Sequence, residues 1–207
     1  MRFTDIIWDF DGTLCDTYPH IAYLFSRVLD EMGIAYEEDD LRRRLSTTFS
    51  RTIAYYARSR EEGSQIYRRY FELENHDLGR IQAYDGIVEV LDYIKAHGGC
   101  SHICTHRGAS LYKYLDHLKL RGRFSIIVNY SDGYALKPSP ESVLSIIHRR
   151  GIEASQALMI GDRDIDTAAG KAAGTATCLL NTNGIARPET ADWEVFQPLN
   201  ILNIIES

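Results

Sequence analysis

From about residue 83 onward, short apolar runs alternate with amphipathic stretches, and this alternation restricts the possible folds more than any other feature of the sequence. The apolar runs, each of strand length, lie at 100–105, 125–130, 157–160 and 175–180, and the helical patterns lie at 86–97, 108–118, from Ser139 onward and at 164–173. Strands that alternate with helices are typical of a parallel sheet with helices on both faces. We therefore predict an α/β protein with a Rossmann-like sheet, completed by a last strand at 192–196 and a short helix from about Leu199.

A long helical segment separates this alternation from an earlier apolar run at 3–8, which is expected to form the first, buried strand. Pro19 suits the first turn of a helix, Gly33 suits its end, and apolar residues recur between them at the helical period. Further helices are expected to begin near Glu37 and to cover about 49–60 and 62–77. We predict a small all-helical domain at 16–82, inserted after the first strand of a main α/β domain formed by 1–15 and 83–207.

The overall composition limits the kinds of partner. The 207 residues carry a net charge of -6, with 44% apolar and 25% charged residues, as in ordinary soluble globular proteins. The acidic balance argues against a general nucleic-acid binder. The chain has no apolar run of membrane-spanning length, and its first residues lack the pattern of a secretory signal. We therefore expect a cytoplasmic monomer or homodimer that binds neither nucleic acid nor membranes.

Polar and charged residues follow four of the predicted strands. In strand order they are Asp9 and Asp11, then Thr105, then Lys137, and finally Asp162 and Asp166. Because open parallel sheets bind ligands beyond the carboxyl ends of their strands, these side chains are expected to meet. A cluster of carboxylates is costly unless a hard cation compensates it, and Mg²⁺ takes oxygen ligands and commonly bridges to phosphate. The pattern predicts a Mg²⁺ site, with Lys137 and the Thr105 hydroxyl placed to hold phosphoryl oxygens.

The same residues carry a resemblance to a known family. Asp9–Thr13 reads D-F-D-G-T, the second strand ends in Thr105, Lys137 is followed by Pro138, and 161–166 reads G-D-R-D-I-D. In this order and spacing, the motifs resemble those of the haloacid dehalogenase-like hydrolase superfamily over nearly the whole chain. The helical domain between the first two motifs resembles the cap of the phosphoglycolate phosphatase-like branch.

The resemblance implies a role for each motif residue. Asp9 is the expected nucleophile, forming an aspartyl-phosphate, and Asp11 is the expected general acid and base. Thr105 and Lys137 are expected to bind the phosphoryl group and balance its charge. The metal ligands implied are the side chains of Asp9, Asp162 and Asp166 and the backbone carbonyl of Asp11. The expected substrate is a small phosphorylated metabolite.

Further residues beside the motifs are candidates for substrate contact. His106 follows Thr105 directly, and Arg51 lies in the predicted helical domain; we predict that both bind substrate. Arg107 and Arg163 are also adjacent to motif residues, and the sequence leaves their role open.

The resemblance favours a Mg²⁺-dependent phosphatase acting on a small phosphate monoester such as phosphoglycolate or a sugar phosphate. Asp11 argues against the dehalogenase and phosphonatase relatives, whose chemistry does not place Asp at that position. A sugar-phosphate mutase shares the motifs and the cap and remains an alternative. A second alternative is a non-catalytic regulator that binds a phosphorylated ligand, although such a protein is expected to have lost one of the carboxylates.

Overall fold

The computed structural model describes residues 1–45, 49–79, 81–182, 184, 186 and 189–206, and it separates into two compact units. Residues 1–16 and 82–207 form one, called here the core unit, and residues 17–81 form the other, called the helical unit. The expected domain bounds, 1–15 with 83–207 and 16–82, differ from these by one residue at each junction. Within the described residues, no helix has both the length and the apolar character required to cross a membrane.

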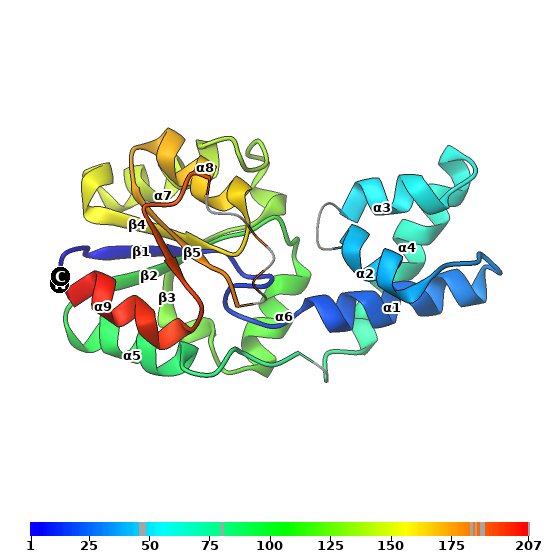
Figure 1. Cartoon of the computed structure of the whole chain (residues 1–207), viewed down its shortest axis with the longest axis horizontal. Helices are drawn as coiled ribbons and strands as arrows, with labels where there is room; N and C mark the ends of the chain where they lie inside the picture. Colours follow the sequence, from blue (N-terminus) through cyan, green and yellow to red (C-terminus); the bar gives the residue numbers. More distant parts are fainter. Residues whose placement is uncertain (46–48, 80, 183, 185, 187–188, 207) are drawn as a thin grey trace. The chain divides into compact units, whose positions relative to one another are not determined.

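The core unit is built on a six-stranded sheet in the order β3-β2-β1-β4-β5-β6, shown in Figure 1. All five strand pairs are parallel. The strands are β1 (Asp5–Trp8), β2 (Cys100–Cys104), β3 (Phe124–Val128), β4 (Ala157–Gly161), β5 (Ala176–Leu180) and β6 (Trp193–Val195). The first strand, β1, lies between β2 and β4, and all four of its residues are buried. The predicted α/β class with a parallel sheet is confirmed.

Among the described residues of the core unit, five helices accompany the sheet. They are α5 (Ile87–Ala96), α6 (Ser110–His117), α7 (Glu141–Arg150), α8 (Asp164–Ala173) and α9 (Ile201–Glu206), and short 3₁₀ turns cover 121–123, 130–132, 154–156 and 198–200. In Figure 1, α7 and α8 cover one face of the sheet, and α5 and α9 cover the other. The helix expected from Ser139 onward begins at Glu141, with Pro140 rather than Ser139 as its N-cap. The other element bounds differ from the predicted ones by a few residues at the ends.

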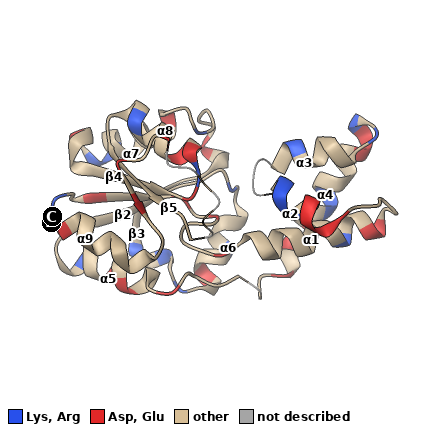
Figure 2. Cartoon of the chain, in the orientation of Figure 1, with Lys and Arg blue, Asp and Glu red and all other residues tan. Residues whose placement is uncertain are grey.

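The helical unit contains α1 (Tyr18–Glu31), α2 (Glu38–Leu45), α3 (Phe49–Tyr56) and α4 (Arg60–His76). Its core combines the apolar face of α1 with residues of the other three helices, among them Leu41, Ile53 and Ile66. The short helix α2 has acidic residues in its first turn and basic residues in its last turn (Figure 2). This order opposes the partial charges at the helix ends and helps a helix of eight residues to form.

The register of the sheet brings the ends of three strands level. Trp8 of β1 pairs with Ile103 of β2 and with Ile160 of β4. Because the strands are parallel, the residues that follow these three leave the sheet at the same edge. This edge therefore receives Asp9, Thr105 and the segment that begins at Gly161.

A buried polar cluster surrounds Asp5 at the start of β1, the end of the strand opposite to Asp9. Asp5 Oδ1 accepts hydrogen bonds from His102 Nε2 at 2.9 Å and from Arg150 Nε at 2.6 Å, and Asp5 Oδ2 accepts from the Thr4 hydroxyl at 2.8 Å. Burial acts to raise the pKa of Asp5, but the hydrogen bonds from Arg150, His102 and Thr4 outweigh it and hold the pKa below its ordinary value. Burial also lowers the pKa of His102, so its imidazole is neutral at pH 7. The cluster joins β1, β2 and α7.

We expect Asp5→Asn to lower the free energy of unfolding by about 2 kcal/mol, because it removes the charge of a buried carboxylate that accepts hydrogen bonds from His102 and Arg150. The matched control is Asp92→Asn, which breaks the exposed pair with Arg123 and should have little effect. Urea denaturation at pH 7 measures both variants. Equal losses in the two variants would show that the Asp5 cluster does not stabilise the core unit.

Candidate active site

A buried lysine lies at the centre of the polar edge of the sheet. Lys137 Nζ is 2.6 Å from Asp9 Oδ1 and 2.6 Å from Asp166 Oδ1, and it donates to the carbonyl of Cys104 at 2.9 Å. The side chains of all three charged residues are at most 1% exposed. Burial alone would lower the pKa of Lys137, but the Asp166 and Asp9 carboxylates raise it well above its ordinary value. Lys137 is therefore a permanent buried cation.

The two carboxylates differ in their surroundings. Burial raises the pKa of Asp9 to about 6, although Lys137 opposes the increase. For Asp166, burial also acts to raise the pKa, but Lys137 and Arg163 outweigh it and hold the pKa below its usual value. Asp166 Oδ2 accepts a hydrogen bond from the backbone N–H of Arg163 at 3.1 Å, whereas Asp9 Oδ2 is buried and has no hydrogen-bond partner among the described residues. Asp9 thus has one oxygen held by Lys137 and a second oxygen available for chemistry.

Three carboxylates at this edge fit a divalent cation. Oxygen atoms of Asp9, Asp162 and Asp166 all lie within 4.8 Å of one another. Asp9 and Asp166 contact the single ammonium of Lys137, and the nearby Asp162 has Arg163 Nε 3.9 Å from its Oδ1, at the margin of an ion pair. Hard oxygen ligands of this kind suit Mg²⁺. The expected part of the Asp11 backbone carbonyl in such a site stays a prediction.

Two glycines shape the turns that carry these carboxylates. Gly12 has φ +80, and its N–H donates to the carbonyl of Cys15 at 2.9 Å, which closes the turn after Asp9. A Cβ at Gly161 would lie 2.1 Å from the Cβ of Asp166, so only glycine lets the end of β4 approach α8 this closely. The G-D-x-x-x-D spacing therefore has a steric cause, because it places Asp166 in the first turn of α8 against the strand.

Thr105 lies directly after β2 and is buried. Its hydroxyl oxygen accepts the backbone N–H of Arg107 at 3.1 Å, and its own N–H donates to the carbonyl of Val128 at 3.0 Å. These bonds hold the side chain in place at the edge of the sheet and leave the hydroxyl hydrogen to donate elsewhere. That arrangement suits the predicted contact with a phosphoryl oxygen.

His106 contacts the backbone of the central lysine. Its Nε2 accepts the N–H of Lys137 at 2.7 Å, which requires the neutral ring with hydrogen on Nδ1. Burial, helped by the charges of Lys137 and Arg163, lowers the pKa of His106 to about 4. The imidazole therefore positions Lys137, a role that the spacing of the motifs did not reveal. Its predicted contact with substrate stays a prediction.

Asp11 is held by Arg107, a residue whose role the sequence left open. Arg107 Nη2 donates to Asp11 Oδ1 at 2.6 Å, and Arg107 Nε lies 3.1 and 3.2 Å from the two carboxylate oxygens. The Arg107 side chain is 6% exposed and that of Asp11 is 20% exposed. The sequence did show a basic residue two positions after Thr105. The spacing does not show which acidic residue it pairs with.

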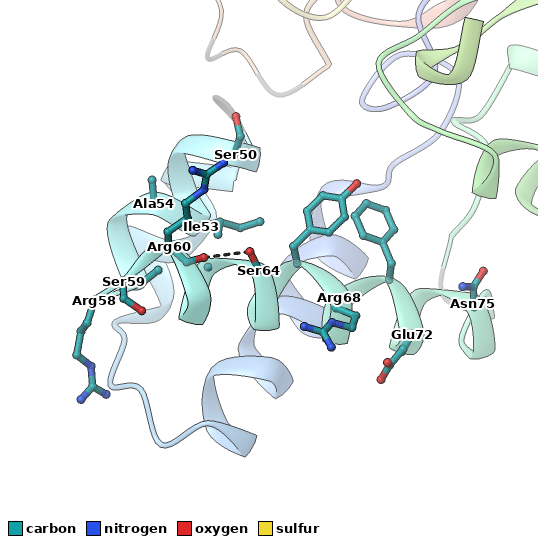
Figure 3. A pocket seen from close by; sticks show the side chains of 14 residues that line it. Ser50, Ile53, Ala54, Arg58, Ser59, Arg60, Ser64, Arg68, Glu72 and Asn75 are labelled. Atoms are coloured by element: carbon teal, nitrogen blue, oxygen red, sulfur yellow. Dashed lines mark hydrogen bonds between the residues drawn. The ribbon is translucent and has the colours of Figure 1, made fainter. Parts of the chain in front are cut away.

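Arg51, the remaining predicted substrate contact, lies on α3 of the helical unit with an exposed side chain. A cavity of about 970 Å³ opens in the same unit between α3 and α4. Figure 3 shows its lining, in which Arg58, Arg60 and Arg68 accompany apolar residues such as Ile53 and Ala54. Arg51 is not among the described residues that line it, so its contact with substrate stays a prediction.

Comparisons with known proteins show which family and which solved structures the chain resembles. The family model for haloacid dehalogenase-like hydrolases matches residues 6–180. A phosphoglycolate phosphatase of Aquifex aeolicus is 29% identical over 207 residues, covering 98% of this chain and 96% of its own length. The pyrophosphatase PpaX of Bacillus velezensis is 33% identical, covering 85% of this chain and 82% of its own. A solved structure of a predicted phosphoglycolate phosphatase from Haemophilus somnus has a TM-score of 0.83 at 21% identity, covering 99% of this chain and 98% of that one, which supports the fold.

The contact between His106 and Lys137 predicts a dependence of stability on pH. The pKa of His106 in the folded protein, about 4, lies below the value of about 6.5 for an unperturbed histidine. Its contribution to the free energy of unfolding is thus complete above about pH 6.5 and is lost as the pH falls towards 4, with a slope of up to about 1.4 kcal/mol per pH unit.

Urea denaturation at pH 7, 6, 5 and 4 measures this slope. His106→Asn should flatten it, because the variant carries no imidazole that must be protonated on unfolding. His117→Asn removes an exposed imidazole on α6 and should keep the wild-type slope. An unchanged slope in His106→Asn would contradict the assignment of His106 as a half-buried neutral acceptor.

Proposed function

The chain belongs to the haloacid dehalogenase-like hydrolase family, and we propose that it is a Mg²⁺-dependent phosphatase acting on small phosphate monoesters through an aspartyl-phosphate on Asp9. The proposal rests on a difference in contacts between the two carboxylate oxygens of Asp9. Lys137 holds Oδ1 at 2.6 Å, and Oδ2 is buried without a described hydrogen-bond partner. A carboxylate fixed through one oxygen presents the other as a nucleophile in a defined direction.

In the first step, Asp9 Oδ2 forms a bond to phosphorus while the bond from phosphorus to the ester oxygen breaks. In this proposal the hydroxyl of Thr105 donates to a phosphoryl oxygen, and the positive charge of Lys137 offsets the negative charge of the phosphoryl group in the transition state. Asp9, Asp162 and Asp166 would hold Mg²⁺, which when bound supplies positive charge that lowers the repulsion between the carboxylate and the phosphoryl group.

In the proposed mechanism, Asp11 handles the proton in both steps. Its carboxyl group protonates the departing ester oxygen and then takes a proton from the water that attacks the aspartyl-phosphate, which releases inorganic phosphate and restores Asp9. Asp11 is two residues from Asp9 in the same turn, so one short segment supplies both the nucleophile and the proton donor. The ion pair with Arg107 must open and Asp11 must take up a proton from water before it can donate that proton to the ester oxygen.

The names of two relatives support a proposal for the substrate class. Phosphoglycolate and pyrophosphate, which appear in the names of two relatives, are small phosphorylated compounds. We propose a small phosphorylated metabolite as the substrate of this chain. A sugar-phosphate mutase would use the same first step and return the phosphoryl group to another hydroxyl of the sugar.

The nucleophile is tested by release of phosphate from an aryl phosphate with and without Mg²⁺. Asp9→Asn should lower kcat/KM by a factor on the order of 10³ or more, because the amide cannot form the covalent intermediate. Asp164→Asn, a carboxylate of α8 outside the cluster, should stay near the wild type. Wild-type activity in Asp9→Asn would refute the assignment of Asp9 as the nucleophile.

The same assays separate the alternative functions. Transfer of phosphate between two positions of a sugar phosphate without net release would favour the mutase, and a wild type that only binds phosphate esters would favour the regulator.

The metal site is tested without catalysis. A ligand that binds only the folded protein stabilises it by about 2.7 kcal/mol at one hundred times its Kd. Saturating Mg²⁺ should therefore raise the Tm of the wild type and of Asp164→Asn, and this increase should be lost in Asp162→Asn. Equal increases in all three proteins would show that Mg²⁺ binds elsewhere.

A further inference from the structure

Arg163 is a cation at a position where a helix disfavours one. It is the N-cap of α8, and the partial charge at a helix N-terminus is positive. Short polar residues such as serine and asparagine are the ones that this position favours. The preceding residue, Asp162, is a carboxylate of the proposed metal site, and Arg163 Nε is 3.9 Å from its Oδ1. Helix formation therefore does not account for an arginine here, whereas the charge of the neighbouring carboxylates does.

The charge of Arg163 acts on more than one of these carboxylates. Burial acts to raise the pKa of both Asp166 and Asp9, and Arg163 joins Lys137 in opposing this effect. The Arg163 side chain is 24% exposed and that of Asp162 is 12% exposed, so water screens their interaction less than it would on an open surface. Arg163 is thus a second cation beside the carboxylate cluster.

The balance of charges determines how strongly the cluster attracts a metal ion. The carboxylates of Asp9, Asp162 and Asp166 carry three negative charges, and Lys137 and Arg163 carry two positive ones. The cluster thus has one negative charge in excess. Without Arg163 the excess would be two, which equals the charge of Mg²⁺. A bound Mg²⁺ also repels the guanidinium, whatever else the guanidinium contacts, because both are cations near the same carboxylates.

We propose that Arg163 competes with Mg²⁺ for the carboxylate cluster and so keeps the affinity of the metal site low. This inference rests on the metal site of the proposed function. In the metal-free protein, Arg163 offsets part of the repulsion between the carboxylates. When Mg²⁺ binds, that favourable contribution is reduced, and the loss weakens the binding of the metal. The low affinity makes the occupied fraction of the site depend on the concentration of Mg²⁺.

Two other interpretations of Arg163 predict different results. If its side chain only supports the start of α8, removing it leaves the affinity for Mg²⁺ unaltered. If it holds the carboxylates in the geometry that the metal requires, removing it weakens the binding. Only the competition predicts that removal of Arg163 strengthens the binding of Mg²⁺.

Isothermal titration calorimetry with MgCl₂ alone, on protein freed of metal by EDTA and dialysis, measures the affinity without any substrate. In Arg163→Gln, the Kd for Mg²⁺ should fall by a factor of about 10 or more at low ionic strength. Arg163→Lys keeps the positive charge, and its Kd should stay within about 3-fold of the wild type. Adding Asp162→Asn to Arg163→Gln should abolish the gain, because the gain arises at the carboxylate cluster.

Arg123→Gln is the matched control. Arg123 also belongs to the core unit and pairs with an aspartate, Asp92, at 2.9 Å, and its side chain is 27% exposed, close to the 24% of Arg163. Because Asp92 lies outside the carboxylate cluster, the Kd of this variant should equal that of the wild type. If Arg163→Gln does not fold, the Kd of Arg163→Ser decides, since serine removes the charge and is a favoured N-cap.

A Kd that is unchanged or higher in Arg163→Gln would overturn the competition, and the proposed metal site would stand. A gain in affinity that survives Asp162→Asn would also overturn it, because the gain would then arise at another site. If neither the wild type nor Arg163→Gln binds Mg²⁺, the metal site itself is refuted, and with it the Mg²⁺ dependence of the proposed function.

Discussion

The buried ammonium of Lys137 is the interaction on which the candidate site depends. It comes from the segment after β3 and meets Asp9 at the end of β1, Asp166 in the first turn of α8 and the carbonyl at the end of β2. Removing it would leave two carboxylates side by side in a medium where an isolated charge is strongly disfavoured. One cation thus holds together segments that are more than one hundred residues apart in the chain, and His106 fixes the backbone from which that cation extends.

Much of this arrangement is determined by the order of residues along the chain. The alternation of apolar runs and amphipathic stretches predicts a parallel sheet, and a parallel sheet brings the residues after its strands to one edge. That is why the sequence alone predicts that Asp9, Lys137 and Asp166 lie together. The physical reason is that strand order and direction fix the place of a residue to within a few ångströms, and charges placed so close must pair.

The sequence did not predict which partner each charged side chain contacts. His106, Arg107 and Arg163 all adjoin motif residues, and spacing alone does not separate them. The structure gives them different tasks: His106 accepts from the backbone of Lys137, Arg107 pairs with Asp11, and the backbone N–H of Arg163 donates to the carboxylate of Asp166. These outcomes depend on rotamers and on the path of short loops, including the close approach permitted by Gly161, and such details are set by packing rather than by periodicity.

The strand β1 has a buried ionic cluster at each end. Asp5 meets His102 and Arg150 at one end, and Asp9 follows the other end to meet Lys137. The apolar residues between them would tolerate many alternative neighbours during folding. A strand docked one residue out of step, or beside the wrong partner, would separate both acids from their cations at once. The ionic contacts at the two ends of β1 therefore favour the correct register and the correct neighbouring strands over incorrect ones when the sheet assembles.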